Sequence, residues 1–223
     1  MVLSLTSKRW TPHFRTLCDR MCGRFSMGSN LTELVQPLDL HVESDHPPRW
    51  NVAPTDAHPV LEWRGNRPEV TVRTWGFSTR SDGRKAPINA RLETVHERGM
   101  FQSAAQHHRV VVPATGWYEW LASPLGRHPH HLRPNEEKGC WMAGIHAGSS
   151  GGFAVLTQQA ASTIRHIHER MPMLLRVEDV LPWLEHGEHP REPVAVEHWP
   201  VSMEVNRVGA QGAHLASPLS TLF

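Results

Sequence analysis

The run RVVVPATGWYEW at residues 109–120 decides the fold class. Valine and aromatic side chains dominate it, and both are enriched in β-strands. Two further runs of this kind follow at residues 140–146 and 153–157. Residues 121–139 are rich in proline, histidine and charge, so we expect a loop between the first two runs. This part of the chain therefore predicts sheet rather than helix.

Helical patterns are few. We expect helices that begin near Leu31 and cover residues 91–108 and 177–186. Asn30 and Glu33 have the spacing of a capping box for the first, and Gly187 closes the last. Strands are expected at residues 166–175 and in a hairpin over residues 60–75. Because strands and helices do not alternate regularly, we predict a mixed α+β domain built on antiparallel sheets.

Composition excludes several classes of protein. Hydrophobic residues make up 39% of the chain and charged residues 20%, which is typical of a globular protein rather than a disordered one. No apolar run approaches the length of a membrane span. Lys and Arg number 23 against 22 Asp and Glu, so a nucleic-acid site must be a local cluster of cations. No organelle signal stands out, and the cytoplasm is the default expectation.

The cysteines are Cys18, Cys22 and Cys140, too few for a disulfide framework and consistent with a reducing compartment. Residues 1–20 differ from the rest, with four basic residues and one acid. A transit peptide, a propeptide and a mis-assigned start codon all explain them, and we favour the last because Met21 directly precedes the first motif. We therefore expect an extension over residues 1–20 and a domain over residues 21–223.

Cys22 follows Met21, and its ordinary interpretation is a buried thiol. Removal of the preceding residues would instead leave a 1,2-aminothiol. Its thiol has a pKa near ~8.5 and its α-amine one near ~7.7–8.0, so both are partly deprotonated near neutrality. An aldehyde forms a Schiff base with such an amine, and the thiol closes it to a thiazolidine. An internal cysteine cannot react in this way, because its nitrogen is an amide.

Three other segments carry polar residues at positions that allow either a structural or a functional role. In NARLET (89–94), Asn89 and Arg91 either cap a helix or offer an amide and a guanidinium to a phosphate. In GWYEW (116–120), Glu119 either faces water from an edge strand or is poorly solvated and suited to acid–base chemistry.

The third segment is HERMP (168–172). His168 and Arg170 either decorate a surface strand or combine proton transfer with phosphate binding on one strand face. His166 and His168 would share that face as a pair of metal ligands. No third ligand at a convincing spacing is apparent, so we predict no metal and no cofactor.

With MCGRF (21–25) and the segment NVAPT (51–55), these segments resemble, in order, the SOS-response-associated peptidase (SRAP) family. Its members include abasic-site shield proteins, and the resemblance runs from Met21 to about Pro218. It implies a single α+β domain around a curved, barrel-like antiparallel sheet with flanking helices. The implied substrate is single-stranded DNA that contains an abasic site, and the implied activities are covalent crosslinking through Cys22, lyase-type chemistry and autopeptidase cleavage.

The resemblance also implies roles for residues. Cys22 is the nucleophile, and Asn51 and Asn89 hold the reacting group. Glu119 and His168 transfer protons. The remaining implied DNA contacts are Arg24, Trp75, Arg91 and Arg170. The sequence departs from the family pattern in two places. The residues after Trp75 lack the usual proline and second tryptophan, and 20 residues precede Met21.

Competing functions share parts of this site. An autopeptidase whose chemistry ends with removal of its own leader needs Cys22, Asn89 and Glu119, but no phosphate-binding arginines. A passive single-stranded-DNA-binding protein would tolerate Cys22→Ala. A metal-binding protein that uses the histidine clusters is a further alternative.

Overall fold

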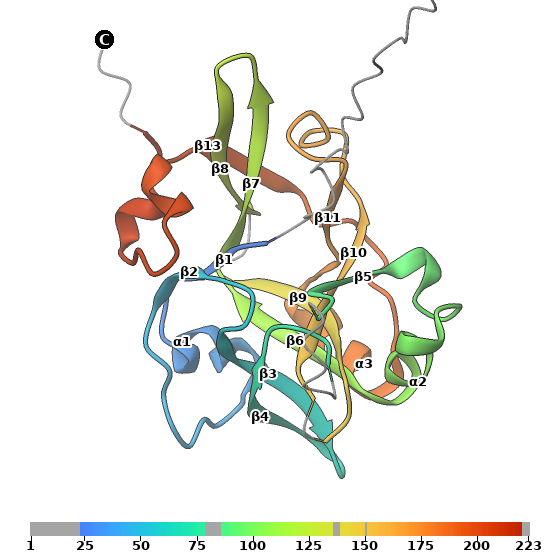
Figure 1. Cartoon of the computed structure of the whole chain (residues 1–223). Helices are drawn as coiled ribbons and strands as arrows, with labels where there is room; N and C mark the ends of the chain where they lie inside the picture. The colour runs from blue at the N-terminus through green and yellow to red at the C-terminus, as the bar shows by residue number, and fades with distance from the viewer. Residues whose placement is uncertain (1–22, 79–85, 136–138, 150, 220–223) are drawn as a thin grey trace, which may run out of the picture.

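The strands form two sheets in the part of the chain that the structure describes (Figure 1). The structure is a computed structural model, and it describes residues 23–78, 86–135, 139–149 and 151–219. Within these residues the chain is a single α+β domain, as the sequence predicts. None of its described helices is long and apolar enough to cross a membrane.

The first sheet has five described strands, in the spatial order β13-β8-β7-β1-β2. All its neighbouring strands are antiparallel. The strands are β1 Phe25–Met27, β2 Arg49–Val52, β7 Gly116–Ser123, β8 Gly126–Pro134 and β13 Val196–Pro200.

The second sheet has eight described strands, with the main order β11-β10-β9-β6-β3-β4. Strand β12 pairs with β9, and β5 lies parallel to β10. The strands are β3 Ala57–Arg64, β4 Arg67–Thr74, β5 Asn89–Arg91, β6 Arg109–Ala114, β9 Cys140–His146, β10 Phe153–Gln159, β11 Arg170–Pro172 and β12 Leu174–Leu175.

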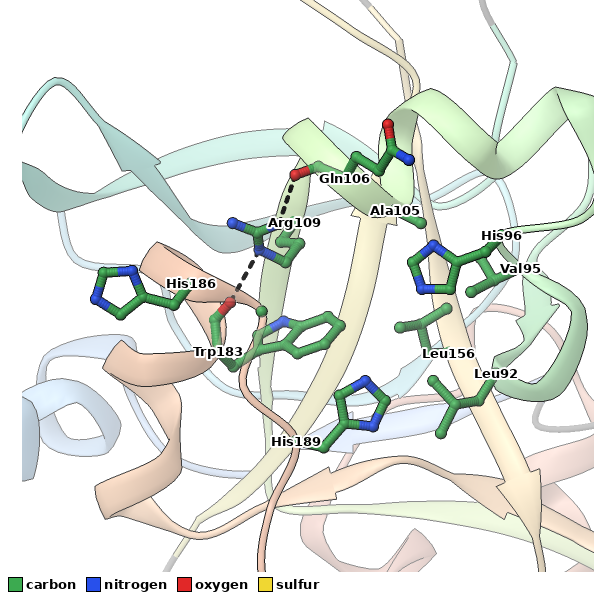
Figure 2. A pocket seen from close by; sticks show the side chains of 11 residues that line it. Leu92, Val95, His96, Ala105, Gln106, Arg109, Leu156, Trp183, His186 and His189 are labelled. Atoms are coloured by element: carbon green, nitrogen blue, oxygen red, sulfur yellow. Dashed lines mark hydrogen bonds between the residues drawn. The ribbon is translucent and has the colours of Figure 1, made fainter.

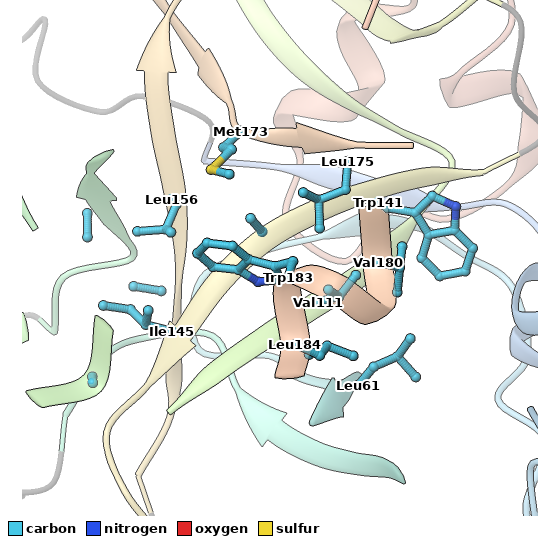
Figure 3. Close-up of a cluster of buried hydrophobic side chains, with 14 of the residues drawn as sticks. Leu61, Val111, Trp141, Ile145, Leu156, Met173, Leu175, Val180, Trp183 and Leu184 are labelled. Carbon is cyan, nitrogen blue, oxygen red and sulfur yellow. The ribbon is translucent and has the colours of Figure 1, made fainter. Parts of the chain in front are cut away.

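Helices cover one face of the second sheet. Trp183 and Val180 of α3 pack there beside Val111 and Leu156, as Figure 3 shows. A second apolar cluster, which includes Trp117 and Val155, joins the two sheets. The described helices are α1 Leu31–Val35, α2 Gly99–His107 and α3 Val177–His186, with 3₁₀ turns η1 Gln36–Leu38, η2 Leu92–Thr94, η3 Met203–Asn206 and η4 Ala213–Leu215.

Several predicted elements are confirmed. The hairpin over residues 60–75 is the β3–β4 pair, which turns at Gly65 in the left-handed region with φ 62°. Helix α3 has the predicted bounds and ends at Gly187 with φ 75°. Helix α1 begins at Leu31, but the predicted capping box is wrong. Asn30 makes no side-chain cap bond, and the Thr32 N–H instead donates to Asp45 Oδ1 at 3.2 Å.

The β-rich run 109–120 is confirmed, and it divides between β6 and β7, which belong to different sheets. Three other predictions are wrong. The expected loop 121–139 contains β8. The expected helix 91–108 is helical from Gly99, because β5 takes its first residues into the sheet. The expected strand 166–175 begins at Arg170, and residues 162–167 form turns. Tertiary pairing decides each case over local preference.

Candidate functional site

The five-stranded sheet presents two different faces. Phe25 lies opposite Trp117, and Glu119 lies opposite His130, so period-2 alternation places all four on one face. Phe25 and Trp117 belong to the cluster between the sheets, and we call this face the inner face. The outer face carries the alternate side chains, including those of Arg24, Asn51, Tyr118 and His131.

Gly116 explains the tight packing at the start of β7. A Cβ atom at this position would collide with the Leu132 carbonyl and the His131 ring on β8. Glycine is therefore required by the close approach of the two strands. This contact fixes the register that brings Glu119 opposite His130 on the inner face.

Glu119 is buried on the inner face, with 2% of its surface exposed. This agrees with the predicted poorly solvated carboxyl and not with an edge-strand glutamate that faces water. Gly23 comes alongside it, because the Phe25–Trp117 pair and the hydrogen bond from Tyr118 N to Arg24 O continue the same antiparallel register. Cys22, the residue before Gly23, lies outside the described residues.

A chain of three histidines leads from Glu119 to the second sheet. His130 Nδ1 lies 3.3 Å from His198 Nδ1, and the His198 and His166 ring centroids are 5.3 Å apart. One Nδ1 donates and the other accepts, so full protonation of both rings breaks the bond. Burial, followed by the charges of neighbouring histidines, lowers the pKa of His130, and burial also lowers the pKa of His198.

His168 follows the turn that carries His166. Its Nδ1 lies 3.0 Å from the Arg170 backbone N and 3.2 Å from the Arg170 carbonyl oxygen. In the tautomer whose Nδ1 accepts the Arg170 N–H, the proton of the neutral ring is on Nε2. The side chain is partly buried. The predicted His166–His168 pair on one strand face is wrong, because the strand begins at Arg170.

NARLET and HERMP meet on strand β10. Asn89 lies opposite Val155 and Arg91 opposite Thr157 in the parallel β5–β10 pair. Arg170 lies opposite Gln159 in the antiparallel pair with β11. Ala90 points into the helix-covered core, so Asn89 and Arg91 share the other face of β5. Arg91 is exposed, as a phosphate-binding residue requires.

Arg170 is engaged by a carboxylate rather than open to solvent. Its Nη1 and Nη2 donate to Glu93 Oε1 at 2.5 Å and Oε2 at 2.7 Å, and Nη2 also donates to the Thr157 carbonyl at 2.6 Å. The hydrogen bond from Arg170 lowers the pKa of Glu93.

Arg24 and Asn51 lie on the outer face, away from Glu119. Arg24 Nη1 donates to Asn51 Oδ1 at 2.8 Å and to the Val205 carbonyl at 2.9 Å. Asn51 Nδ2 donates to the carbonyls of Val205 and Arg207 at 3.2 and 3.1 Å. Both ends of the buried amide are thus occupied in holding η3, which does not fit the predicted contact with a reacting group. Arg24 likewise fastens the C-terminal segment.

Trp75 is a core residue with 1% of its surface exposed. Its ring stacks on Phe153 at 6.3 Å between centroids and meets Phe25 at 4.9 Å. Its Nε1 donates to the Ile88 carbonyl at 2.9 Å. The predicted DNA contact by Trp75 is therefore wrong for this conformation, because no face of the indole is open to a base.

Two cavities adjoin this region. One of 550 Å³ is lined by Glu93, Gln159, Arg165, Glu169 and Arg170. Another of 210 Å³ lies between α2 and α3, where Arg109 donates to the carbonyls of Trp183 and Gln106 (Figure 2). Its wall includes Leu156, which belongs to the helix-covered core, so this cavity lies on the other side of the sheet from Arg91. Among the described residues, no group of three or more His, Cys, Asp or Glu is placed to hold a metal ion.

Sequence reasoning missed His130 and His198. Residues 128–131 looked like a compositional loop, because Pro129 interrupts the pattern. An alternating pattern does not mark this strand, because residues 129–132 of β8 are all buried in succession. His198 is placed beside His130 by the pairing of β13 with β8, which local sequence does not encode.

The family model described as SOS response associated peptidase (SRAP) matches residues 21–210. The chain belongs to the SRAP family. The resemblance drawn from the five ordered segments is thereby confirmed.

Curated relatives carry the name abasic site processing protein. YedK of Escherichia coli is 28% identical, over 89% of this chain and 100% of the relative. YoqW of Bacillus subtilis is 26% identical, over 74% of this chain and 80% of the relative. A crystal structure of a protein from Bacteroides thetaiotaomicron shares the fold, with a TM-score of 0.76 and 20% identity over 88% of this chain and 99% of that one.

Proposed function

We propose that this SRAP protein processes abasic sites in single-stranded DNA and captures them covalently through Cys22 as the N-terminal residue. The observation that carries the proposal is the histidine chain from β8 to the turn before β11. It brings the strand of Glu119 beside the segment of His168, with Gly23 alongside Glu119. The names of the curated relatives support an abasic site as the substrate.

The chemistry begins at the free α-amine of Cys22. The amine adds to the C1′ aldehyde of the ring-opened deoxyribose, and the adduct loses its hydroxyl as water to give an imine. The Cys22 thiolate then attacks the imine carbon, and the nitrogen takes a proton. The products are a thiazolidine and one water molecule, so atoms balance and nothing is oxidised or reduced.

Two residues are assigned to proton transfer. Glu119 is buried, which suits a carboxyl group that protonates the departing hydroxyl and accepts a proton again in a later step. In the tautomer whose Nδ1 accepts the Arg170 N–H, His168 carries its proton on Nε2, which suits a second donor during sugar ring opening. Asn89 holds the reacting group, and Arg91 binds a neighbouring phosphate by charge-assisted hydrogen bonds. Arg170 is assigned to a second phosphate.

A denaturing gel tests the proposal. Protein that starts at Met21, with its mass confirming an exposed Cys22, is incubated with a single-stranded oligonucleotide containing one abasic site. We expect an SDS-stable shifted band that is absent in Cys22→Ala. Cys140→Ala is the matched control, because this cysteine is buried in β9 and should leave the band intact. A band that persists in Cys22→Ala would refute the assignment.

An autopeptidase is the second candidate, because the family description itself says peptidase. In that case the chain that starts at Met1 should lose the mass of residues 1–21 on incubation, and Cys22→Ala should not. Self-cleavage without a DNA-linked band would establish the peptidase in place of the crosslinking protein. Both activities together would mean that cleavage exposes the crosslinking residue.

A further inference from the structure

Arg170 cannot bind a phosphate through its Nη1–Nη2 fork in the conformation described. Glu93 occupies the fork between Nη1 and Nη2 with both carboxylate oxygens, and the Thr157 carbonyl takes a further Nη2 hydrogen. The remaining edge of the guanidinium includes Nε, which is buried without a hydrogen-bond partner among the described residues. A bidentate phosphate contact therefore requires one of these partners to leave.

Glu93 is the partner that can leave. Its side chain is 50% exposed, whereas that of Arg170 is 15% exposed. Glu93 lies in η2, a three-residue 3₁₀ turn directly after β5, and a rotation of its side chain reaches water without disturbing the sheet. Ion pairs with one partner this exposed contribute little to stability, because water competes for both groups.

We propose that Glu93 is an internal phosphate mimic that holds Arg170 closed, so that a DNA phosphate binds there only by displacing it. This inference rests on the proposed function and adds a control of affinity to it. Intact single strands meet exposed Arg91 but find Arg170 occupied. The 550 Å³ cavity beside the pair is lined by two arginines and two glutamates, and release of Glu93 leaves it with excess positive charge.

Glu169 provides a matched control. It lines the same cavity and carries the same charge, but it does not occupy the Arg170 fork. Glu93→Gln and Glu169→Gln therefore each remove one negative charge from the lining of the cavity. A difference between them reports the specific contact rather than net charge.

The test measures binding of the full chain to a fluorescent oligothymidylate without abasic sites, over a range of salt concentrations. We expect Glu93→Gln to bind about 5–10-fold more tightly at low salt. We also expect its log–log salt slope to steepen by about 0.7, the value for one added phosphate contact on a single strand. Glu169→Gln should change affinity less than twofold, and Arg170→Gln in the Glu93→Gln background should abolish the gain.

Other outcomes overturn the inference in distinguishable ways. Weaker or unchanged binding by Glu93→Gln, with an unchanged melting temperature, would make Glu93 a support for Arg170 rather than a competitor of phosphate. Equal gains in Glu93→Gln and Glu169→Gln would assign the effect to net charge. Absence of single-strand binding in every variant would overturn the proposed function, and this inference with it.

Discussion

The two faces of the five-stranded sheet are made from alternate residues of the same strands, yet they differ in purpose. The inner face carries Glu119 and His130 toward the second sheet. The outer face packs against the C-terminal segment, where Trp120 Nε1 donates to Asn206 Oδ1 at 2.7 Å. On the same face the Tyr118 hydroxyl donates to the Trp50 carbonyl of β2 at 2.7 Å. Under the proposed function, neighbours in one motif therefore act in chemistry and in stability respectively.

The largest expected effect separates Glu119 from its neighbour Tyr118. Glu119→Gln should slow covalent capture about 100-fold or more, because an amide of the same shape cannot transfer the proton. Tyr118→Phe should leave the rate within about twofold but lower the free energy of unfolding by about 1–3 kcal/mol, because the partly buried Trp50 carbonyl loses its donor. Single-turnover gels and urea unfolding measure the two quantities. An equal loss of capture rate in Glu119→Gln and Tyr118→Phe would show that the two faces do not differ in function.

Asn51 tests the outer face directly. Asn51→Ala should lower the free energy of unfolding by about 2–4 kcal/mol, because two carbonyls and the Arg24 guanidinium lose a buried partner. Capture by the folded protein should stay at the rate of the unmodified chain. A tenfold slower capture, measured under conditions in which circular dichroism shows the variant to be folded, would show that Asn51 acts in the reaction.

The pH dependence of stability should depend more on His131, on the outer face, than on His130. Burial lowers the pKa of His131 to about 3, below the unfolded value near 6.5. The unfolded chain therefore binds the proton first, and the stability present above pH 6.5 is lost as the pH falls toward 3. The expected slope is about 1.4 kcal/mol per pH unit for this residue.

Unfolding curves of His131→Gln and His130→Gln between pH 7 and 4 measure this contrast. His131→Gln should flatten the dependence more than His130→Gln, whose ring is less deeply buried. The reverse order would show that the inner-face histidine chain, and not the Ser26–His131 contact, limits stability in acid.

The smallest expected effect distinguishes Arg91 of NARLET from Arg24 of MCGRF. Arg91→Ala should reduce the log–log salt slope of single-strand binding by about 0.7, because one phosphate contact is lost. Arg24→Ala should leave the slope unchanged, since its guanidinium is bound to Asn51 and Val205. Fluorescence anisotropy at several salt concentrations resolves the two, and a reduced slope for Arg24→Ala would place DNA on the outer face.

Sequence predicted elements where a local signal was strong. Gly187 closes α3 and Gly65 turns the β3–β4 hairpin, because only a few residues adopt a left-handed backbone without strain. It did not predict β8, since the proline and histidines of residues 128–131 are typical of a loop and the buried residues 129–132 do not alternate with exposed ones. Nor did it predict that β6 and β7 join different sheets, because that division follows from pairing with distant strands.

For the candidate site, the sequence by itself determined the ordered segments that identify the family, the chemical groups that they carry and the position of Cys22 next to Gly23. Tertiary structure decided which of these groups face one another. Trp75 stacks in the core, Arg24 and Asn51 hold η3, and Arg170 is closed by Glu93. The physical reason is that a strand sends successive side chains to opposite faces, and only the pairing of strands far apart in the chain decides what each face meets.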